Sequence, residues 1–482
     1  MKRLFLGLLG FFLLAFAACG SKEPELPPYG QGNKEEFEQF LTEIMPQEDP
    51  WTEEELQTYE SYLQPKGFEH VFSEEEIKEL FKSKKNPKSV TSQQAAEDVT
   101  LAFELLSYVY GGYHYFGGDE VFFPIRDSIL AKLTSMKEIQ TNDLWELLWE
   151  GLSPVIADNH FELSTDQRGI YAHERDYSQS TYFVRDLYFD DPTGVDPQYV
   201  KRTIGPEGAL TYCLATVCKS PENLPTTMTI EGVEHPLSWH LAQPTVLSSS
   251  KEKKVFSETT MADGRLPVLQ NYSFGGSDKK MNEFAATGTS YKEEPLFVLD
   301  LRGNLGGNDG YAHTWIKNFC GKDVIEKELW SAKITTSYTV ANGGFVNANG
   351  GVWRTSESDG TLWETDNLIF VLIDNNTASS GESFTNMLTL GKRVILVGTN
   401  TMGCLNFGNA NKLYLPNSGI MLRLGANCSF YQSLDKTEGI GYSPDLWVEP
   451  SDSLDAVVRL CHYYGLYEES VYLDENISNT YR

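Results

Sequence analysis

The chain has 482 residues, of which 40% are hydrophobic and 12% aromatic, which is enough apolar material for a folded protein of roughly two or three domains. The net charge is −29, which disfavours binding to the phosphate backbone and so predicts no nucleic-acid partner. We expect this acidic charge to form a solvated surface that keeps the protein soluble.

Residues 1–19 have the pattern of an export signal. Two basic residues precede the apolar run 4–16, which is shorter than a membrane span, and small residues follow up to Cys19. The ending FAAC resembles the lipobox of bacterial lipoproteins, in which the cysteine is lipidated and becomes the new N-terminus. The resemblance predicts an exported cell-envelope lipoprotein that is held at a membrane only through Cys19. The polar, Pro/Gly-rich residues 20–34 would be its linker.

Residues 35–160 have the periodicity of helices and predict an N-terminal helical domain. Ser73 and Glu76 have the spacing of a capping box at the start of one helix. Thr141 or Asn142 is placed to cap another helix. Two further helix faces are marked by apolar residues at helical spacing, namely Phe37, Phe40, Leu41 and Ile44 in the first and Leu101, Leu105 and Tyr108 in the second.

The character of the chain changes after residue 160. Between 161 and 265, short runs of aromatic and β-branched residues such as 181–189 and 226–233 predict a β-rich intermediate region. Between 266 and 465, the continuous apolar runs LFVLDL, LIFVLID and RVILVG read as buried strands that alternate with helices. This order predicts an α/β (α+β) fold with a largely parallel sheet covered by helices. Residues 466–482 would form a C-terminal tail.

The segment VLIDNNTASSGESFTNML, residues 371–388, places Ser379 between a predicted buried strand and a predicted helix. The N–H groups and the dipole at the start of that helix favour a developing negative charge. Ser379 is therefore a candidate nucleophile. The alternative from this segment alone is that Ser379 or Ser380 serves only as the N-cap of the helix.

A second segment, DLRGNLGGN at 300–308, combines a strand end with a glycine-rich turn. Glycines allow the backbone to approach a ligand closely. Exposed N–H groups of this turn could form an oxyanion hole together with the N–H after the nucleophile. A structural turn without a catalytic role is the alternative.

These segments, followed by VGTNTMG and GIGYSPDLWVEP in that order, resemble peptidase family S41 over roughly residues 266–450. That family includes the C-terminal processing proteases and the tricorn protease. The resemblance implies a crotonase- or ClpP-like catalytic core, with Ser379 as the nucleophile and oxyanion donors near Gly306 or Gly307, joined by the N–H of Ser380. It also implies a peptide or protein substrate and a reaction that needs no metal or cofactor.

The identity of the base depends on the branch of the family. The lysine-dyad branch has a lysine in the segment where this chain has Cys404, and a thiol is a poor substitute for a neutral amine. Lys392 and Lys412 are near in sequence but match no family motif.

The tricorn-like branch uses a histidine as base and a glutamate before its final motif. The matching residues are His160 in ADNHF and Glu438 in TEGIGYSPD, with Asn159 where the tricorn pattern has a serine. His313 is a second candidate base. The alternatives are a structural histidine at 160 and a surface carboxylate at 438.

The predicted function is therefore that of an exported, lipid-anchored serine peptidase. Two other functions remain open. A non-catalytic binding lipoprotein could keep the fold without the lysine, and a serine hydrolase could act on non-peptide esters. Six cysteines remain besides Cys19 among the seven of the chain, and Cys404 and Cys428 are candidates for a disulfide beside the site. The sequence does not indicate the oligomeric state.

Overall fold

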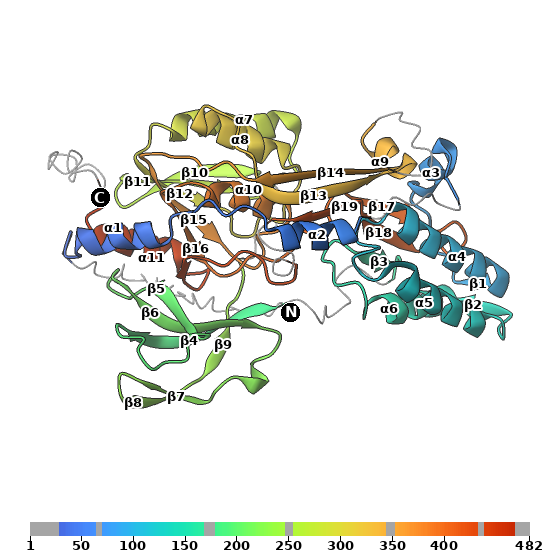
Figure 1. The fold of residues 1–482 in the computed structure, drawn as a ribbon, viewed down its shortest axis with the longest axis horizontal. Coiled ribbons are helices and arrows are strands. Elements are labelled where there is room, and N and C mark those ends of the chain that lie inside the picture. The colour runs from blue at the N-terminus through green and yellow to red at the C-terminus, as the bar shows by residue number, and fades with distance from the viewer. Residues whose placement is uncertain are drawn as a thin grey trace, which may run out of the picture.

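The computed structural model describes residues 28–63, 70–167, 179–245, 254–343, 352–431 and 438–467 (Figure 1). The predicted signal and lipidation site at 1–19, most of the linker and most of the tail lie outside these residues. Among the described helices, none is both long and apolar enough to span a bilayer.

A central sheet of six strands forms the core of the C-terminal half, in the order β10-β11-β12-β15-β16-β20. All neighbouring strands from β11 to β20 are parallel, and only β10 pairs antiparallel. The prediction of a largely parallel α/β sheet is confirmed. The strands are β10 (Phe256–Met261), β11 (Leu266–Asn271), β12 (Leu296–Asp300), β15 (Leu368–Ile373), β16 (Val394–Gly398) and β20 (Leu446–Trp447).

The central sheet is apolar on both faces because helices cover both sides (Figure 1). Along β12, Phe297 and Leu299 pack in one core and Leu296 and Val298 in the other, as the alternation of a strand requires. The first core lies under α7 (Asp278–Tyr291), α8 (Gly310–Cys320) and α10 (Ser380–Thr389), and the second under α1 (Lys34–Glu43) and α11 (Ser453–Tyr463).

The β-rich intermediate region forms a sheet in the order β5-β6-β4-β9 and a hairpin of β7 with β8, below the central sheet in Figure 1. The predicted runs 181–189 and 226–233 fall on β4 and on β7 with the start of β8. The elements are β4 (Ser180–Phe189), β5 (Val200–Ile204), β6 (Leu210–Cys218), the 3-10 helix η1 (Pro221–Asn223), β7 (Thr227–Ile230), β8 (Val233–Pro236) and β9 (Trp239–Leu241).

The N-terminal helices share their core with strands from later in the chain, and the helical domain expected at 35–160 stays a prediction. Leu105 and Leu148 of two helices share one core with Leu422 and Phe430 of distant strands. The helices are α2 (Glu53–Ser61), α3 (Glu74–Leu80), α4 (Ser92–Val109), α5 (Gly118–Leu133) and α6 (Thr141–Leu152), with the strand pair β1 (Ser89–Thr91) and β2 (Glu138–Gln140).

Two small sheets connect this helical part to the rest of the chain, on the right in Figure 1. One has the order β17-β18-β3 and the other β14-β13-β19. Their elements are β3 (Glu162–Ser164), β13 (Lys327–Ile334), β14 (Val352–Asp359), β17 (Ala410–Tyr414), β18 (Met421–Gly425) and β19 (Asn427–Phe430), with α9 (Thr336–Ala341) after β13.

The predicted helix starts are partly right. Ser73 and Glu76 make the expected capping box of α3. At α6 the expectation was wrong, because the N-cap is Gln140 without a side-chain cap. Thr141 is already the first helical residue, and its hydroxyl donates to the Pro87 carbonyl instead. α1 packs on the central sheet through Phe37 and is thus separate from the other N-terminal helices.

Candidate active site

Three loops meet at one edge of the central sheet. The chain segment with Ser379 follows β15, the glycine turn at 303–307 follows β12, and the segment 399–404 follows β16. These strands are parallel neighbours, so their carboxyl ends lie at the same edge. Loops at the carboxyl ends of parallel strands are the usual place for a binding or catalytic site in α/β sheets.

Ser379 lies at a sharp turn between β15 and α10. Its φ of 52° and ψ of −120° are rare for a residue with a side chain. The surrounding structure must therefore hold this conformation. Ser379 N–H donates to Glu382 Oε2 at 3.0 Å, while its Oγ contacts a histidine and Ser380 Oγ donates to the Gly307 carbonyl at 2.9 Å.

Glu382 links the turn of Ser379 to the loop after β16. Besides Ser379 N–H, its buried carboxyl accepts hydrogen bonds from the Thr401 hydroxyl at 2.6 Å and from the N–H groups of Gly403 and Cys404, both at 2.8 Å. Burial raises the pKa of Glu382 to about 7, and the four donors act in the opposite direction. This carboxyl is a shared anchor for two of the three loops.

His160 lies in the turn between α6 and β3 and is 5% exposed. Its Nε2 is 3.1 Å from Ser379 Oγ. The backbone of His160 donates to Asp158 Oδ1 at 2.6 Å, and Tyr110 donates to Asp158 Oδ2 at 2.8 Å. The structure thus brings together the serine and the histidine that the sequence singled out, from opposite halves of the chain.

Glu438 lies under the histidine turn and binds backbone N–H groups. It accepts hydrogen bonds from Asn159 at 2.7 Å, Leu405 at 3.2 Å and Asn406 at 2.9 Å. Burial, with a contribution from Asp158, raises the pKa of Glu438 well above its usual range. Its position joins the peptide unit before the histidine to the loop after β16. Asn159 adds a second link, since its side chain donates to the Gly403 carbonyl at 2.8 Å.

Cys404 stands directly against the histidine ring. Its Sγ is 3.4 Å from His160 Nδ1 and 3.5 Å from Nε2. Burial, followed by the negative charge of Glu438, raises the pKa of Cys404 well above the ordinary value, so the group is a neutral thiol. A neutral thiol is only a weak hydrogen-bond partner and cannot replace a lysine base.

The expected disulfide between Cys404 and Cys428 is wrong, because both are free thiols. Cys428 belongs to β19 and packs in the core that the helices share with the small sheets. Cys404 is directed to His160 instead, so the two sulfur atoms lie in different environments.

The glycine turn lies directly against the turn of Ser379. Gly306 has a φ of +93°, and a Cβ at this position would lie 2.8 Å from Ser379 Cβ, so only glycine fits. The Gly306 N–H already donates to Asn304 Oδ1 at 2.9 Å. In the described part of the chain, the N–H groups of Gly307 and Ser380 have no such acceptor.

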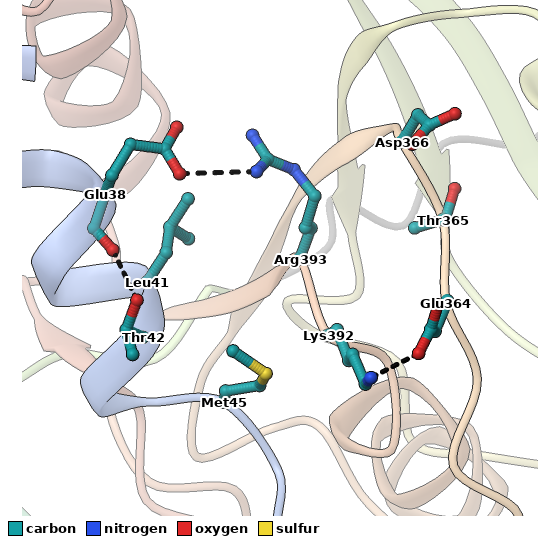
Figure 2. Close-up of a pocket in the computed structure, with 9 residues that line it drawn as sticks. All are labelled: Glu38, Leu41, Thr42, Met45, Glu364, Thr365, Asp366, Lys392 and Arg393. Carbon is teal, nitrogen blue, oxygen red and sulfur yellow. Dashed lines mark hydrogen bonds and ion pairs between the residues drawn. The ribbon is translucent and has the colours of Figure 1, made fainter.

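Among the described residues, none of the other candidate bases makes a hydrogen bond to Ser379. Figure 2 shows a pocket that Lys392 and Arg393 line, where Lys392 pairs with Glu364 and Arg393 with Glu38. Lys392 precedes the amino end of β16, which is the opposite edge of the sheet from Ser379. Lys412 is exposed on β17, and His313 Nε2 is 3.6 Å from Glu326 Oε1.

Sequence reasoning missed Asp158, Tyr110, Asn304 and the anchoring role of Glu382. Asp158 stands two residues before His160 in ADNHF, and an acidic residue at this spacing could have suggested a turn that accepts the histidine N–H. Tyr110 had no signal, because only the packing of α4 brings it to this turn.

A cavity of about 340 Å³ opens against Ser379 and His160, and Gly307, Ser380 and Cys404 also line it. A serine at a strand-to-helix turn with a histidine in hydrogen-bond reach is the arrangement of hydrolases that act by acyl transfer. Residues 265–448 match the model of peptidase family S41. This segment is a peptidase S41 domain, which confirms the resemblance of the sequence motifs and supports a peptidase function on peptides or proteins.

Similarities to solved structures are remote. A putative peptidase from Parabacteroides merdae ATCC 43184 is 16% identical, with 76% of this chain and 93% of that chain covered and a TM-score of 0.41. Mature CPAF is 13% identical, with 80% of this chain and 96% of that chain covered and a TM-score of 0.43. The tricorn protease is 15% identical, with 76% and 35% covered and a TM-score of 0.36. No curated protein matches the chain.

Proposed function

We propose that the protein is a serine peptidase in which Ser379 is the nucleophile and His160 the general base. The observation that carries the proposal is the 3.1 Å approach of His160 Nε2 to Ser379 Oγ. This contact lies at the wall of a cavity. The turn that holds Ser379 gives it a positive φ, which few residues other than glycine adopt.

The reaction would proceed by acyl transfer. His160 Nε2 takes the proton of Ser379 Oγ while the oxygen attacks the peptide carbonyl, and the imidazolium then gives this proton to the leaving amine. Water, activated by His160, hydrolyses the acyl-serine ester. The N–H groups of Gly307 and Ser380 would hold the oxyanion. Gly306 would shape this hole rather than donate to it, since its N–H already binds Asn304.

Glu438 supports the base in this mechanism through the backbone. It accepts the N–H of Asn159, the residue before His160, and N–H groups of the loop after β16. We therefore assign it a positioning role. Nothing in this sequence of steps requires a metal or cofactor.

A fluorophosphonate probe tests the proposal, because it forms a covalent bond only with an activated serine. We expect labelling of the wild-type protein, no labelling of Ser379→Ala, and labelling of the matched control Ser380→Ala. Labelling that survives in Ser379→Ala and disappears in Ser380→Ala would move the nucleophile by one residue. If the wild-type protein takes no probe, the non-catalytic binding protein becomes the better description. If it takes the probe and cleaves esters but no peptides, the ester hydrolase does.

We also propose that the protein is exported and anchored in the cell envelope through Cys19. The support is the basic start, the apolar run and the FAAC ending of residues 1–19. Cys19→Ser should abolish incorporation of an alkyne-labelled fatty acid and release the protein from the membrane fraction. Cys320→Ser is the matched control and should keep the label. Equal labelling of Cys19→Ser and the wild-type protein would contradict the anchor.

A further inference from the structure

The cavity beside Ser379 has a lining that is unusual for a pocket that binds an apolar side chain. Among the described residues, asparagine and serine side chains make up most of its wall, Leu405 is the one lining leucine, isoleucine or valine, and no lysine or arginine lines it. A polar wall costs free energy when an apolar group covers it. The cavity is therefore suited to a substrate group that carries hydrogen-bond donors.

Asn427, at the start of β19, offers a hydrogen-bond acceptor for such a donor group. It lines the cavity, it is only 8% exposed, and its Oδ1 meets no donor among the described residues. A buried acceptor without a donor is costly and rare. A donor group of a bound substrate would remove this cost.

Carboxyl groups gather on the side of the cavity formed by α8, β13 and α10. Asp309 lines the cavity directly. Ser383, also in the lining, donates its hydroxyl to the buried Glu326. Burial raises the pKa of Glu326 well above its usual range, with Glu328 as the next cause and Asp309 as a further one. Burial together with Asp309 raises the pKa of Glu328 to about 7.

The positive groups near this side do not balance it. His313 on α8 lies 3.6 Å from Glu326 Oε1 and is partly exposed. Within the part of the chain that the structure describes, the carboxyls of Glu326 and Glu328 thus lack a full cationic partner, which agrees with their raised pKa values. Among the described residues, no group of three or more His, Cys, Asp or Glu side chains could hold a metal ion. The cation that fits is an organic one that brings its own donors.

We propose that this cavity binds the side chain of a lysine or arginine next to the scissile bond. This inference rests on the proposed function and names its substrate class. The positive group would face Asp309 and the side of Glu326 and Glu328, and one of its N–H groups would donate to Asn427 Oδ1. An acidic side chain at the same position would face the carboxylate of Asp309 in a partly desolvated cavity.

Matched peptide substrates test this inference with the full-length protein. One set of fluorogenic peptides should vary the residue before the cleaved bond, and a second set the residue after it. Within each set the peptides differ only at that residue, which is lysine, norleucine or glutamate. Norleucine has nearly the length of lysine without its charge. We expect kcat/KM for lysine to exceed that for norleucine by about tenfold or more, and glutamate to be the poorest. Equal rates for lysine and norleucine at both positions, or faster cleavage beside norleucine or glutamate, would overturn the inference.

Two variants locate the effect. Asp309 makes no side-chain cap of α8, so Asp309→Asn should fold, and the ratio of lysine to norleucine should fall several-fold. Asp323→Asn removes the same charge beyond the other end of α8, where Asp323 pairs with Lys317 at 2.8 Å, and should keep the ratio. An unchanged ratio in both Asp309→Asn and Glu328→Gln would contradict the acidic side as the source of selectivity.

Labelling of Ser379 separates failure of this inference from failure of the proposed function. n-Butylammonium should slow fluorophosphonate labelling of the wild-type protein at concentrations where n-butanol does not. If the probe labels Ser379 and neither additive slows it more than the other, the serine hydrolase stands and the cationic pocket falls. If Ser379 takes no probe and no peptide is cleaved, both fall.

Discussion

At the scale of single residues, the proposed chemistry depends on the contact between Ser379 and His160. An imidazole accepts a proton only in its neutral form, and it is the usual base near neutral pH. The neutral thiol of Cys404 contacts the imidazole ring of His160 and does not compete for the serine proton. The histidine ring is therefore the group whose protonation state should control activity.

We expect His160→Ala to lower kcat/KM on the order of 10³-fold or more, comparable to Ser379→Ala, because members of one catalytic unit are not additive. In the wild-type protein, kcat/KM should fall as the pH is lowered, because an imidazolium cannot accept the serine proton. The measurement is peptide hydrolysis from pH 5 to pH 9. Glu438→Gln should cost less, since Glu438 binds backbone N–H groups.

The matched control for His160→Ala is His313→Ala, because His313 lies beside Glu326 and is partly exposed. It should keep the pH profile of the wild-type protein. Near wild-type activity of His160→Ala, together with loss of activity in Lys392→Ala or Lys412→Ala, would make a lysine the base.

At the scale of elements, the site depends on how closely the glycine turn after β12 approaches the start of α10. Glycine at position 306 permits this close approach, because a Cβ there would lie 2.8 Å from Ser379 Cβ and 2.9 Å from Ser380 N. The turn and the helix start must fit without a side chain between them. The oxyanion donors proposed at Gly307 and Ser380 depend on the same fit.

Gly306→Ala should therefore displace the turn and lower kcat by about 10²-fold or more, since loss of one oxyanion donor has this effect. It should also destabilise the fold by about 1–3 kcal/mol through backbone strain. Gly194→Ala is the matched control, because Gly194 has a similar φ of +82° but nothing within 4 Å of the added Cβ. It should show only the strain. Equal kcat for the two variants would contradict the close approach.

At the scale of the whole molecule, the pH dependence of stability should reflect several buried carboxyls. Burial raises the pKa of Glu382, Glu328 and Asp445 to about 7 in each case. The folded protein then binds protons between about pH 4 and 7 that the unfolded chain releases. Because the slope of the unfolding free energy with pH follows the protons bound in the unfolded minus the folded state, it is negative in this range.

We therefore expect the unfolding free energy to decrease as the pH rises from about 4.5 to 7.5, the stabilisation being complete below the unfolded pKa values and lost through the folded ones. Denaturant unfolding at several pH values measures it. Asp445→Asn should make the slope shallower by up to about 1.4 kcal/mol per pH unit, since Asn can still accept the Leu396 N–H that Asp445 Oδ2 binds at 2.8 Å.

The net charge of −29 also destabilises the folded protein as carboxyls ionise, but salt screens it. In about 0.5 M NaCl this contribution should largely disappear, while that of the buried groups should remain. The exposed Asp263→Asn is the control and should keep the wild-type slope. A slope that vanishes in salt, or equal slopes for Asp445→Asn and Asp263→Asn, would contradict the buried carboxyls as its origin.

The sequence by itself determined the features that depend on neighbours along the chain. Continuous apolar runs predicted β12, β15 and β16, because strands covered on both faces need apolar residues at every position. The strand-turn-helix pattern placed Ser379 at a carboxyl end, and the family motifs selected His160 and Glu438. Ser73 and Glu76 were predictable as a capping box because their interaction spans three residues.

Only the tertiary structure decided the contacts between distant segments. The helices around Leu105 and Leu148 complete their core with strands of residues beyond 400, and periodicity along one helix does not say which surface covers its apolar face. For the same reason the sequence missed Tyr110 at Asp158, the engagement of the Gly306 N–H by Asn304 and the separate environments of Cys404 and Cys428. A residue's own pattern predicts its element, but the partner of its polar or sulfur atom depends on which loops the fold brings together.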